Sequence, residues 1–315
     1  MGHSNILIAD DFHPILLQQL DEKGIAYNYQ PQISREGILE ALKLGATGLV
    51  IRSKTHADAA LIDCGKELNF IARGGAGMDN VDEEYAISKG IECFNAGEAN
   101  SDAVGEHTIG MLLSLFHKIT KADAEVRQGI WLREENRGIE LAGKTIGIIG
   151  YGNTGSAVAK KLSGFNLRVL AYDKYKTGYG NHLVEEVNEA EIFQHADILT
   201  IHIPLNGHTK NMVTSEYLQL FVKNIFLLNL SRGGIVNVKD VIYNLQIGKL
   251  LGFAADVLPH EDPRSMGDSD RIWFNELVQK KNVVLTPHVA GWTKESYEKI
   301  SAVLAGKICS KVLSQ

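Results

Sequence analysis

Short apolar runs alternate with helical patterns along most of the chain, and this alternation favours an α/β fold with parallel strands. In the N-terminal part the apolar runs predict strands near Ile6–Ala9, Gly48–Ile51, Asn69–Ile71 and Ile91–Cys93. Apolar residues at helical spacing predict helices between these strands, for example over Ile15–Lys23 and Ser34–Leu44.

Strands recur in the second part of the chain. They are predicted at Thr145–Ile149, Arg168–Tyr172, Ile198–His202, Ile225–Leu230, Leu250–Ala255 and Val283–Leu285. The segment from Ala103 to Ile119 is apolar on more than one face, so we expect a helix buried on all sides, between two domains or against a second subunit. The Pro263–Asp270 stretch is predicted to be a polar loop, and a last helix is predicted roughly from Lys294 to Leu313.

A glycine-rich turn, Gly150-Tyr151-Gly152-Asn153-Thr154-Gly155, follows the strand that ends at Ile149 and precedes a helical pattern. In a dinucleotide site the first glycine permits the tight turn, the second lets the backbone approach the pyrophosphate, and the third lets helix and strand pack closely. The N-terminus of the helix then offers unpaired N–H groups to the phosphates. The alternative is an ordinary glycine-rich turn of an α/β domain. The expected cofactor contacts here are Gly150, Gly152, Asn153, Thr154 and Gly155.

An acidic residue, Asp173, ends the next apolar run, 18 residues after Gly155. A carboxylate at this place can bind both ribose hydroxyls of a dinucleotide, whereas the 2′-phosphate of NADP would meet a like charge. Strand, glycine turn, helix, strand and acid together predict a dinucleotide site, and we expect the cofactor to be NAD.

The composition is that of a globular protein and argues against several classes of function. The 315 residues are enough for two domains, and 44% of them are hydrophobic and 22% charged. A net charge of −6 without a run of Lys or Arg gives no support for nucleic-acid binding. No stretch predicts a membrane span or a signal peptide. The three cysteines are far apart and form no CxxC pair, so we expect reduced thiols in a cytoplasmic protein and no metal site.

Three polar residues follow later strands of the second part. Arg232 follows Asn229-Leu230-Ser231, Glu261 follows Asp256–His260, and His288 follows Thr286-Pro287. Ligands of open α/β sheets bind outside the carboxyl ends of the strands, so we expect these three side chains to reach one crevice. Taken singly, each has a structural alternative: a structural histidine, an arginine that caps a glycine loop, and one of several solvated acids. The prediction depends on the ordered set.

Such a set suits the oxidation of a 2-hydroxy acid, which requires hydride transfer to a nicotinamide and loss of the hydroxyl proton. A neutral imidazole accepts that proton near physiological pH. A carboxylate on the other ring nitrogen fixes the tautomer and stabilises the imidazolium, and a guanidinium holds the substrate carboxylate. His288, Glu261 and Arg232 suit these three roles.

At these motifs the chain resembles the D-isomer-specific 2-hydroxyacid dehydrogenase family, over nearly its whole length. The resemblance is carried by Ala72–Asp82, Gly143–Thr145 with the glycine turn, His202–Leu205, Asn229–Gly234, Asp256–Glu261 and Thr286–His288. It implies a two-domain α/β fold and a homodimer built on the long helix. The NAD domain, a Rossmann-type doubly wound parallel sheet, would cover residues 100–289, and a flavodoxin-like substrate domain would combine residues 1–99 and 290–315.

The resemblance also implies a set of site residues. The catalytic set would be Arg232, Glu261 and His288, and the residues beside the nicotinamide and along its groove would be Asp256, His202, Thr200 and Pro204. The sequence departs from the family at Asn153-Thr154, where a basic residue and Ile are common. It also departs at Asp262, which stands between Glu261 and Pro263 and is therefore the alternative for the catalytic acid.

Within the family, the chain is most similar to the branch that oxidises 3-phospho-D-glycerate to 3-phosphohydroxypyruvate in serine synthesis. Its substrate carries a carboxylate, for which backbone N–H groups can form a nest, and a dianionic phosphate, which requires cationic partners. The expected substrate-binding residues are Arg52, Ser53, Gly75, Ala76, Gly77 and Arg133, with Lys54 as a further cation. The alternative for the charged residues is that they simply face solvent.

Two other functions stay open at this point. One is a glyoxylate or hydroxypyruvate reductase on the same scaffold, and the other is an NAD-sensing corepressor that binds partner peptides. The chain ends 27 residues after His288, so we expect a short form without a regulatory domain. The expected partners are a small 2-hydroxy or 2-keto acid and a second copy of the chain, with neither nucleic acid nor membrane.

Overall fold

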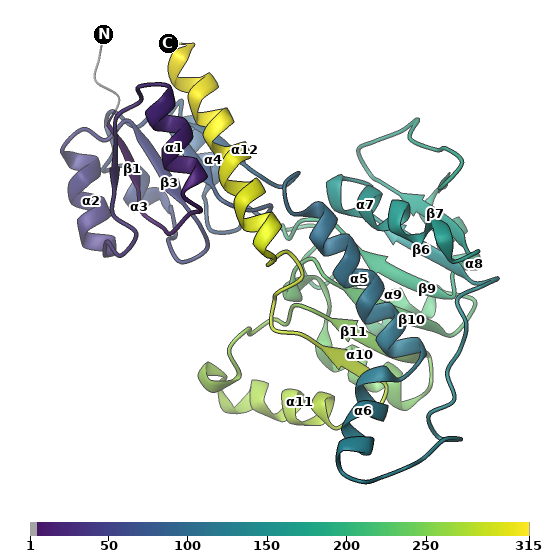
Figure 1. Ribbon diagram of the computed structural model, residues 1–315. Helices are drawn as coiled ribbons and strands as arrows, with labels where there is room; N and C mark the ends of the chain where they lie inside the picture. The colour runs from purple at the N-terminus through teal and green to yellow at the C-terminus, as the bar shows by residue number, and fades with distance from the viewer. Residues whose placement is uncertain (1–4, 315) are drawn as a thin grey trace. The chain divides into compact units, whose positions relative to one another are not determined.

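The computed structural model describes residues 5–314, which form two compact units, each built on its own parallel sheet (Figure 1). Unit 1 contains the residues up to Asn100 and those from Trp292 onward, and unit 2 contains Ser101–Gly291. None of the helices between residues 5 and 314 is both long and apolar enough to cross a membrane.

Unit 1 is built on a five-stranded sheet with the strand order β2-β1-β3-β4-β5. Its strands are β1 (Ile6–Ile8), β2 (Tyr27–Tyr29), β3 (Gly48–Ile51), β4 (Phe70–Arg73) and β5 (Glu92–Asn95). This is the order of flavodoxin-like doubly wound sheets, so the predicted fold of this part is confirmed. The order reverses between β1 and β3, which makes their carboxyl ends the switch point of the sheet.

Helices cover both faces of the unit 1 sheet, because successive strand residues point to opposite sides. Ile6 and Ile8 pack against α1 (Ile15–Glu22) and α12 (Lys294–Leu313), which lie side by side (Figure 1). Leu7 faces the opposite core, which is formed with α2 (Arg35–Lys43), α3 (Ala59–Ile62) and α4 (Glu83–Ser88). The strands β1, β3 and β4 are therefore apolar at nearly every position, and this explains why continuous apolar runs predicted them.

Unit 2 is built on a seven-stranded sheet with the order β12-β11-β10-β9-β6-β7-β8. Its strands are β6 (Thr145–Ile149), β7 (Arg168–Tyr172), β8 (Glu185–Glu186), β9 (Ile198–Ile201), β10 (Ile225–Asn229), β11 (Leu250–Ala255) and β12 (Val283–Leu285). Counted from β6, this is the order of the Rossmann fold with one more strand at the edge, as predicted.

The helices of unit 2 also lie on both faces of the sheet. On one face α5 (Ser101–Phe116) packs against α7 (Asn153–Lys161), and both bury apolar residues against the strands. The other core contains residues of α8 (Glu189–His195), α9 (Ser215–Gln219), α10 (Val238–Gln246) and α11 (Asp268–Val278). Figure 1 shows α5 across the sheet and α6 (Ile119–Arg127) after it.

Two predictions need correction. The long helix ends at Phe116 and not at Ile119, because Lys118 adopts a left-handed conformation with φ of 53° and a separate helix begins at Ile119. In the single chain Gly110 of that helix is exposed, and burial of the helix on all sides by a second subunit stays a prediction. The predicted loop over residues 263–270 includes the first turn of α11, where acids favour a helix start and Trp273 and Leu277 are buried four residues apart. The short edge strands β2 and β8 were missed.

Candidate active site

The glycine turn joins β6 to α7 at the switch point of the unit 2 sheet, between β6 and β9. Gly150 has a φ of +92°, and a Cβ added there would lie 2.5 Å from the carbonyl oxygen of His202. A Cβ on Gly155 would lie 2.1 Å from the carbonyl oxygen of Gly150, so neither position accepts a side chain. Gly152, the N-cap of α7, would meet nothing within 4 Å. The N–H groups at the start of α7 are thus open to a close ligand such as a pyrophosphate.

Asp173 follows β7 and connects it to the glycine turn. Its Oδ2 accepts the backbone N–H of Tyr151 at 2.8 Å, and its Oδ1 accepts those of Tyr175 and Lys176 at 2.9 and 3.1 Å. A carboxylate has about four acceptor sites, so capacity for a ribose hydroxyl remains. Asp173 also lines a cavity of about 460 Å³ together with Tyr172, Lys176 and Glu186 of β8. The glycine turn and this cavity fit a dinucleotide.

His202 follows β9, and burial lowers the pKa of its imidazole to about 4, so the ring is neutral near pH 7. Its Nε2 lies 2.9 Å from the hydroxyl of Thr200, and its Nδ1 is enclosed without a hydrogen-bond partner among residues 5–314. An enclosed polar atom of this kind suits a bound ligand. Thr200 is fully buried, while Pro204 is exposed and accepts a hydrogen bond from Thr209 through its carbonyl. Contacts of Thr200 and Pro204 with a cofactor stay predictions.

The loops after β10, β11 and β12 carry Arg232, Glu261 and His288, and these strands are neighbours in the sheet. The Nδ1 of His288 lies 2.6 Å from the Oε1 of Glu261. This contact requires a proton on Nδ1 of the neutral ring, which leaves Nε2 as a proton acceptor. The Nε2 of His288 has no hydrogen-bond partner among the described residues. The pair is thus arranged as a base with an orienting carboxylate.

Asp256 fixes the turn that carries His288. Its side chain is 1% exposed and accepts the N–H groups of Val289 and Ala290 at 2.9 and 2.8 Å and the hydroxyl of Thr286 at 2.5 Å. Its carbonyl accepts the N–H of His288 at 2.8 Å. His288 has a φ of 55°, a conformation that residues other than glycine rarely adopt, and the bonds on both sides of it hold this backbone. The role of Asp256 in the structure is positional, and its predicted contact with a cofactor stays a prediction.

The alternative acid, Asp262, is bonded to Arg264. Its carboxylate forms two hydrogen bonds with the Arg264 guanidinium, at 2.9 and 3.0 Å, and accepts the N–H of the same residue. The hydrogen bonds with Arg264 lower the pKa of Asp262. The acid that contacts His288 is therefore Glu261. The third member of the set, Arg232, begins the 3₁₀ turn Gly233–Ile235 and donates from Nη1 to the Ser231 carbonyl at 2.7 Å.

The predicted substrate residues belong to both units. In unit 1, Arg52 and Ser53 follow β3, and Gly75, Ala76 and Gly77 follow β4. The N–H groups of these last three residues have no acceptor within the described part of the chain, as an anion nest requires. In unit 2, Arg133 lies in the exposed loop after α6, and its guanidinium has no hydrogen-bond partner among residues 5–314.

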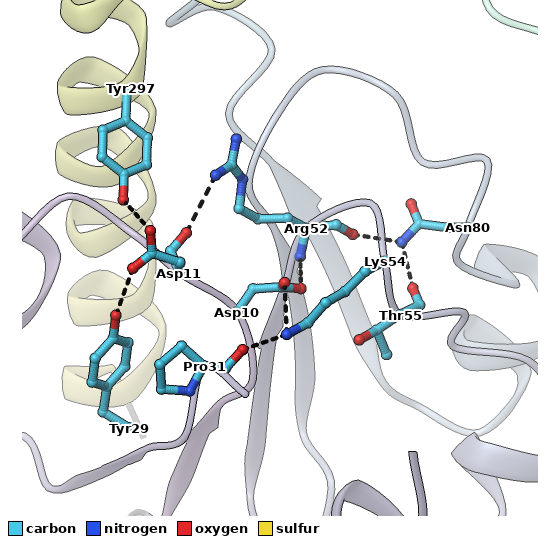
Figure 2. Close-up of polar contacts among 9 residues, drawn as sticks. All are labelled: Asp10, Asp11, Tyr29, Pro31, Arg52, Lys54, Thr55, Asn80 and Tyr297. Carbon is cyan, nitrogen blue, oxygen red and sulfur yellow. Dashed lines mark hydrogen bonds and ion pairs between the residues drawn. The ribbon is translucent and has the colours of Figure 1, made fainter. Parts of the chain in front are cut away.

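Figure 2 shows the surroundings of Arg52 at the switch point of unit 1. Its backbone N–H donates to Oδ2 of Asp10 at 2.7 Å, and its carbonyl accepts Nδ2 of Asn80 at 2.7 Å. Asp10 also pairs with the Lys54 ammonium at 3.3 Å, and this ammonium donates to the Pro31 carbonyl. Lys54 therefore has structural bonds, and its role as a cation for the substrate stays a prediction.

Two acidic residues of this site were missed by the sequence analysis. Asp10 and Asp11 directly follow the apolar run Ile6–Ala9, so the rule that selected Arg232 and His288 would have selected them as well. The network of His107, whose Nε2 lies 3.0 Å from the Thr286 hydroxyl, was also missed. His107 lies on a helix about 180 residues earlier in the chain, and no spacing rule connects the two. Among the described residues, no group of three or more His, Cys, Asp or Glu side chains could hold a metal ion.

Comparisons with known proteins identify the family of this chain. A family model described as the NAD binding domain of D-isomer specific 2-hydroxyacid dehydrogenases matches residues 109–290, more than half of the chain. The chain belongs to this family.

Two relatives within the family illustrate its range. A D-3-phosphoglycerate dehydrogenase of Methanocaldococcus jannaschii is 34% identical over 98% of this chain, and the chain spans about 59% of that relative's length. A hydroxypyruvate reductase of Thermotoga maritima is 33% identical over 82% of this chain and 83% of the relative. Among solved structures of the fold, a glyoxylate reductase from Paecilomyes thermophila has a TM-score of 0.86 at 21% identity, over 99% of this chain and 96% of that one.

Proposed function

We propose that the protein is an NAD-dependent dehydrogenase of D-2-hydroxy acids and that its substrate is 3-phospho-D-glycerate, the reaction of serine synthesis. The observation that carries the dehydrogenase proposal is the contact of 2.6 Å between His288 Nδ1 and Glu261 Oε1, on the loops after the adjacent strands β12 and β11 of the sheet that also carries the glycine turn. The family model, which describes an NAD binding domain, supports the cofactor.

The residues of unit 2 suit this reaction. A bound nicotinamide supplies the acceptor for the hydride that leaves the carbon bearing the hydroxyl group. Nε2 of His288 takes the hydroxyl proton, so that the alcohol becomes a carbonyl, and the carboxylate of Glu261 stabilises the imidazolium that forms. Arg232 holds the substrate carboxylate through charge-assisted hydrogen bonds. The glycine turn, the start of α7 and Asp173 would hold the dinucleotide.

The proposal of a phosphorylated substrate is supported by the guanidinium of Arg52, by backbone N–H groups near it in the sheet, and by the relatives. The guanidinium of Arg52 lies at the switch point of unit 1, where open sheets bind ligands, and it forms no ion pair among the described residues. Gly75, Ala76 and Gly77 follow the neighbouring strand β4, and their N–H groups are available for the carboxylate of the substrate. Relatives named D-3-phosphoglycerate dehydrogenase match nearly the whole chain.

A second candidate is the reduction of hydroxypyruvate. It is favoured by the relative of that name in Thermotoga maritima, of which the chain covers 83%, against 59% for the first phosphoglycerate dehydrogenase. The two candidates differ in the phosphate group and share the chemistry of His288 and Glu261.

Replacing Arg52 with Ala separates the candidates. Loss of the guanidinium should raise KM for 3-phosphoglycerate by about tenfold or more and change KM for D-glycerate by less than about threefold, because only the phosphate loses a charge-assisted contact. Steady-state rates of NADH formation with both acids measure this. The matched control is Arg35→Ala, because Arg35 is an arginine of the same unit that is paired with Asp58 at 2.7 Å. Equal effects of Arg52→Ala on the two acids would contradict the phosphate proposal.

We also propose that the chain forms a homodimer. The segment of α6 and the loop after it exposes large apolar side chains, and such surfaces mark protein interfaces. These are Ile119, Val126, Ile130, Trp131, Leu132 and Ile139. Sedimentation velocity should show a dimer for the unmodified chain and a shift toward monomer for Trp131→Glu. A monomer at all concentrations would contradict the proposal.

A further inference from the structure

The guanidinium of Arg52 lies over two aromatic rings at the start of α12. Its Cζ lies 4.5 Å from the ring centroid of Trp292 and 5.4 Å from that of Tyr297. The two rings also contact each other, with their centroids 5.7 Å apart. Cation–π contacts at these distances are attractive, and more so for arginine, whose planar group lies flat on a ring. Trp292 is 55% exposed, so hydrophobic burial alone does not explain its position.

Asp11 holds the second ring in place. Its Oδ2 accepts the hydroxyl of Tyr297 at 3.0 Å, and its Oδ1 accepts that of Tyr29 at 2.9 Å (Figure 2). Burial, together with the hydrogen bond to Asp11, raises the pKa of Tyr297 to about 12, so its hydroxyl stays protonated and remains a donor. The backbone carbonyl of Asp11 accepts Nη1 of Arg52 at 3.3 Å. Tyr297 is thus fixed at both its ring and its hydroxyl.

The charge of Arg52 is left available. Asp10 is paired with Lys54, and Asp11 bonds two tyrosine hydroxyls through its carboxylate and meets Arg52 only through its backbone carbonyl. Within residues 5–314, the bond to that carbonyl is the single hydrogen bond of the guanidinium. A guanidinium has five N–H donors, so this single hydrogen bond leaves the others available for an anion. A stacked arginine also has less rotamer freedom to lose when it binds.

We propose that Trp292 and Tyr297 are positioning residues that hold the Arg52 guanidinium for the phosphate of the substrate, and that they thereby set the preference for phosphorylated over unphosphorylated 2-hydroxy acids. The inference rests on the proposed function, because it assigns residues to the phosphate subsite of that reaction. The rings act through Arg52. Neither ring is assigned a part in hydride or proton transfer.

The test compares Trp292→Ala with the conservative variant Trp292→Phe, with 3-phosphoglycerate and D-glycerate as substrates. Trp292→Ala should raise KM for 3-phosphoglycerate by about tenfold, leave its kcat within about twofold, and leave KM for D-glycerate within about twofold. Trp292→Phe keeps a ring face and should restore most of the affinity. The matched control is Tyr85→Ala, which removes another ring of unit 1 on which a cation, the Lys89 ammonium, lies at 4.9 Å. It should change neither KM.

The outcomes separate the two levels of the proposal. Suppose that Arg52→Ala raises KM for 3-phosphoglycerate relative to the unmodified protein, whereas Trp292→Ala leaves it unchanged. The positioning role of Trp292 is then overturned, and the proposed function stands. Equal rises of KM for both acids in Trp292→Ala would also overturn it, because they would indicate a general structural defect. If the unmodified protein shows no preference for 3-phosphoglycerate, the phosphate proposal fails, and this inference fails with it.

Discussion

Replacement of His288 with Asn should lower kcat by about a hundredfold or more and leave the affinity for NADH nearly unchanged. An amide cannot accept the hydroxyl proton, and it cannot be stabilised as a cation by Glu261. Asn is the suitable replacement, because His288 has a φ of 55° and Asn tolerates this conformation better than most residues. Steady-state rates with 3-phosphoglycerate and titration of NADH by fluorescence measure the two quantities.

The chain offers a matched control for His288. His260 lies in the loop before Glu261, is half exposed, and has its Nε2 2.8 Å from Oδ2 of Asp270. It is therefore also a histidine paired with a carboxylate, but its partner Asp270 lies in the first turn of α11. His260→Asn should leave kcat within about twofold. If His288→Asn kept the kcat of the unmodified protein, proton transfer would have to be assigned to another group.

The architecture was predictable because the central strands of both sheets are buried on both faces. A strand such as Thr145–Ile149 is then a continuous apolar run, and its bounds could be predicted to the residue. Two of the edge strands, β2 and β8, gave no such signal. Tyr27–Tyr29 is only half-buried and Glu185–Glu186 is exposed, so neither is distinguished from a loop by its sequence. The break at Lys118 depends on one left-handed residue that is neither glycine nor asparagine, and composition does not reveal it.

The proton-transfer pair was predictable for a different reason. Glu261 and His288 each follow a strand, and adjacent parallel strands bring such residues to one edge of the sheet. The choice between Glu261 and Asp262 required coordinates, because it depends on which carboxylate Arg264 occupies. The rings beside Arg52 were also beyond prediction. Trp292 and Tyr297 come from the far end of the chain, and only the packing of α12 on α1 returns them to the first sheet.

Replacement of Gly155 with Ala should destabilise the protein by about 3 kcal/mol or more and abolish strong NADH binding. The added methyl group would lie 2.1 Å from the carbonyl oxygen of Gly150, and both atoms are fixed by the backbone. No rotamer change can relieve this contact, so α7 must move away from β6 and disturb the turn. Urea unfolding and NADH titration measure the two effects.

A substitution at Gly152 separates the effect on cofactor binding from the effect on protein stability. A methyl group there meets nothing within 4 Å in the protein, so Gly152→Ala should cost only about 1 kcal/mol, the usual loss at an N-cap. It should nevertheless weaken NADH binding by about tenfold or more, since the methyl group would occupy space that the pyrophosphate requires. Gly164→Ala, also in open space but beyond the C-terminal end of α7, should change neither quantity appreciably. The space beside Gly152 contains no protein atom, so only a bound pyrophosphate can conflict with the added methyl group. If Gly152→Ala bound NADH as tightly as the unmodified protein, the pyrophosphate would have to lie elsewhere.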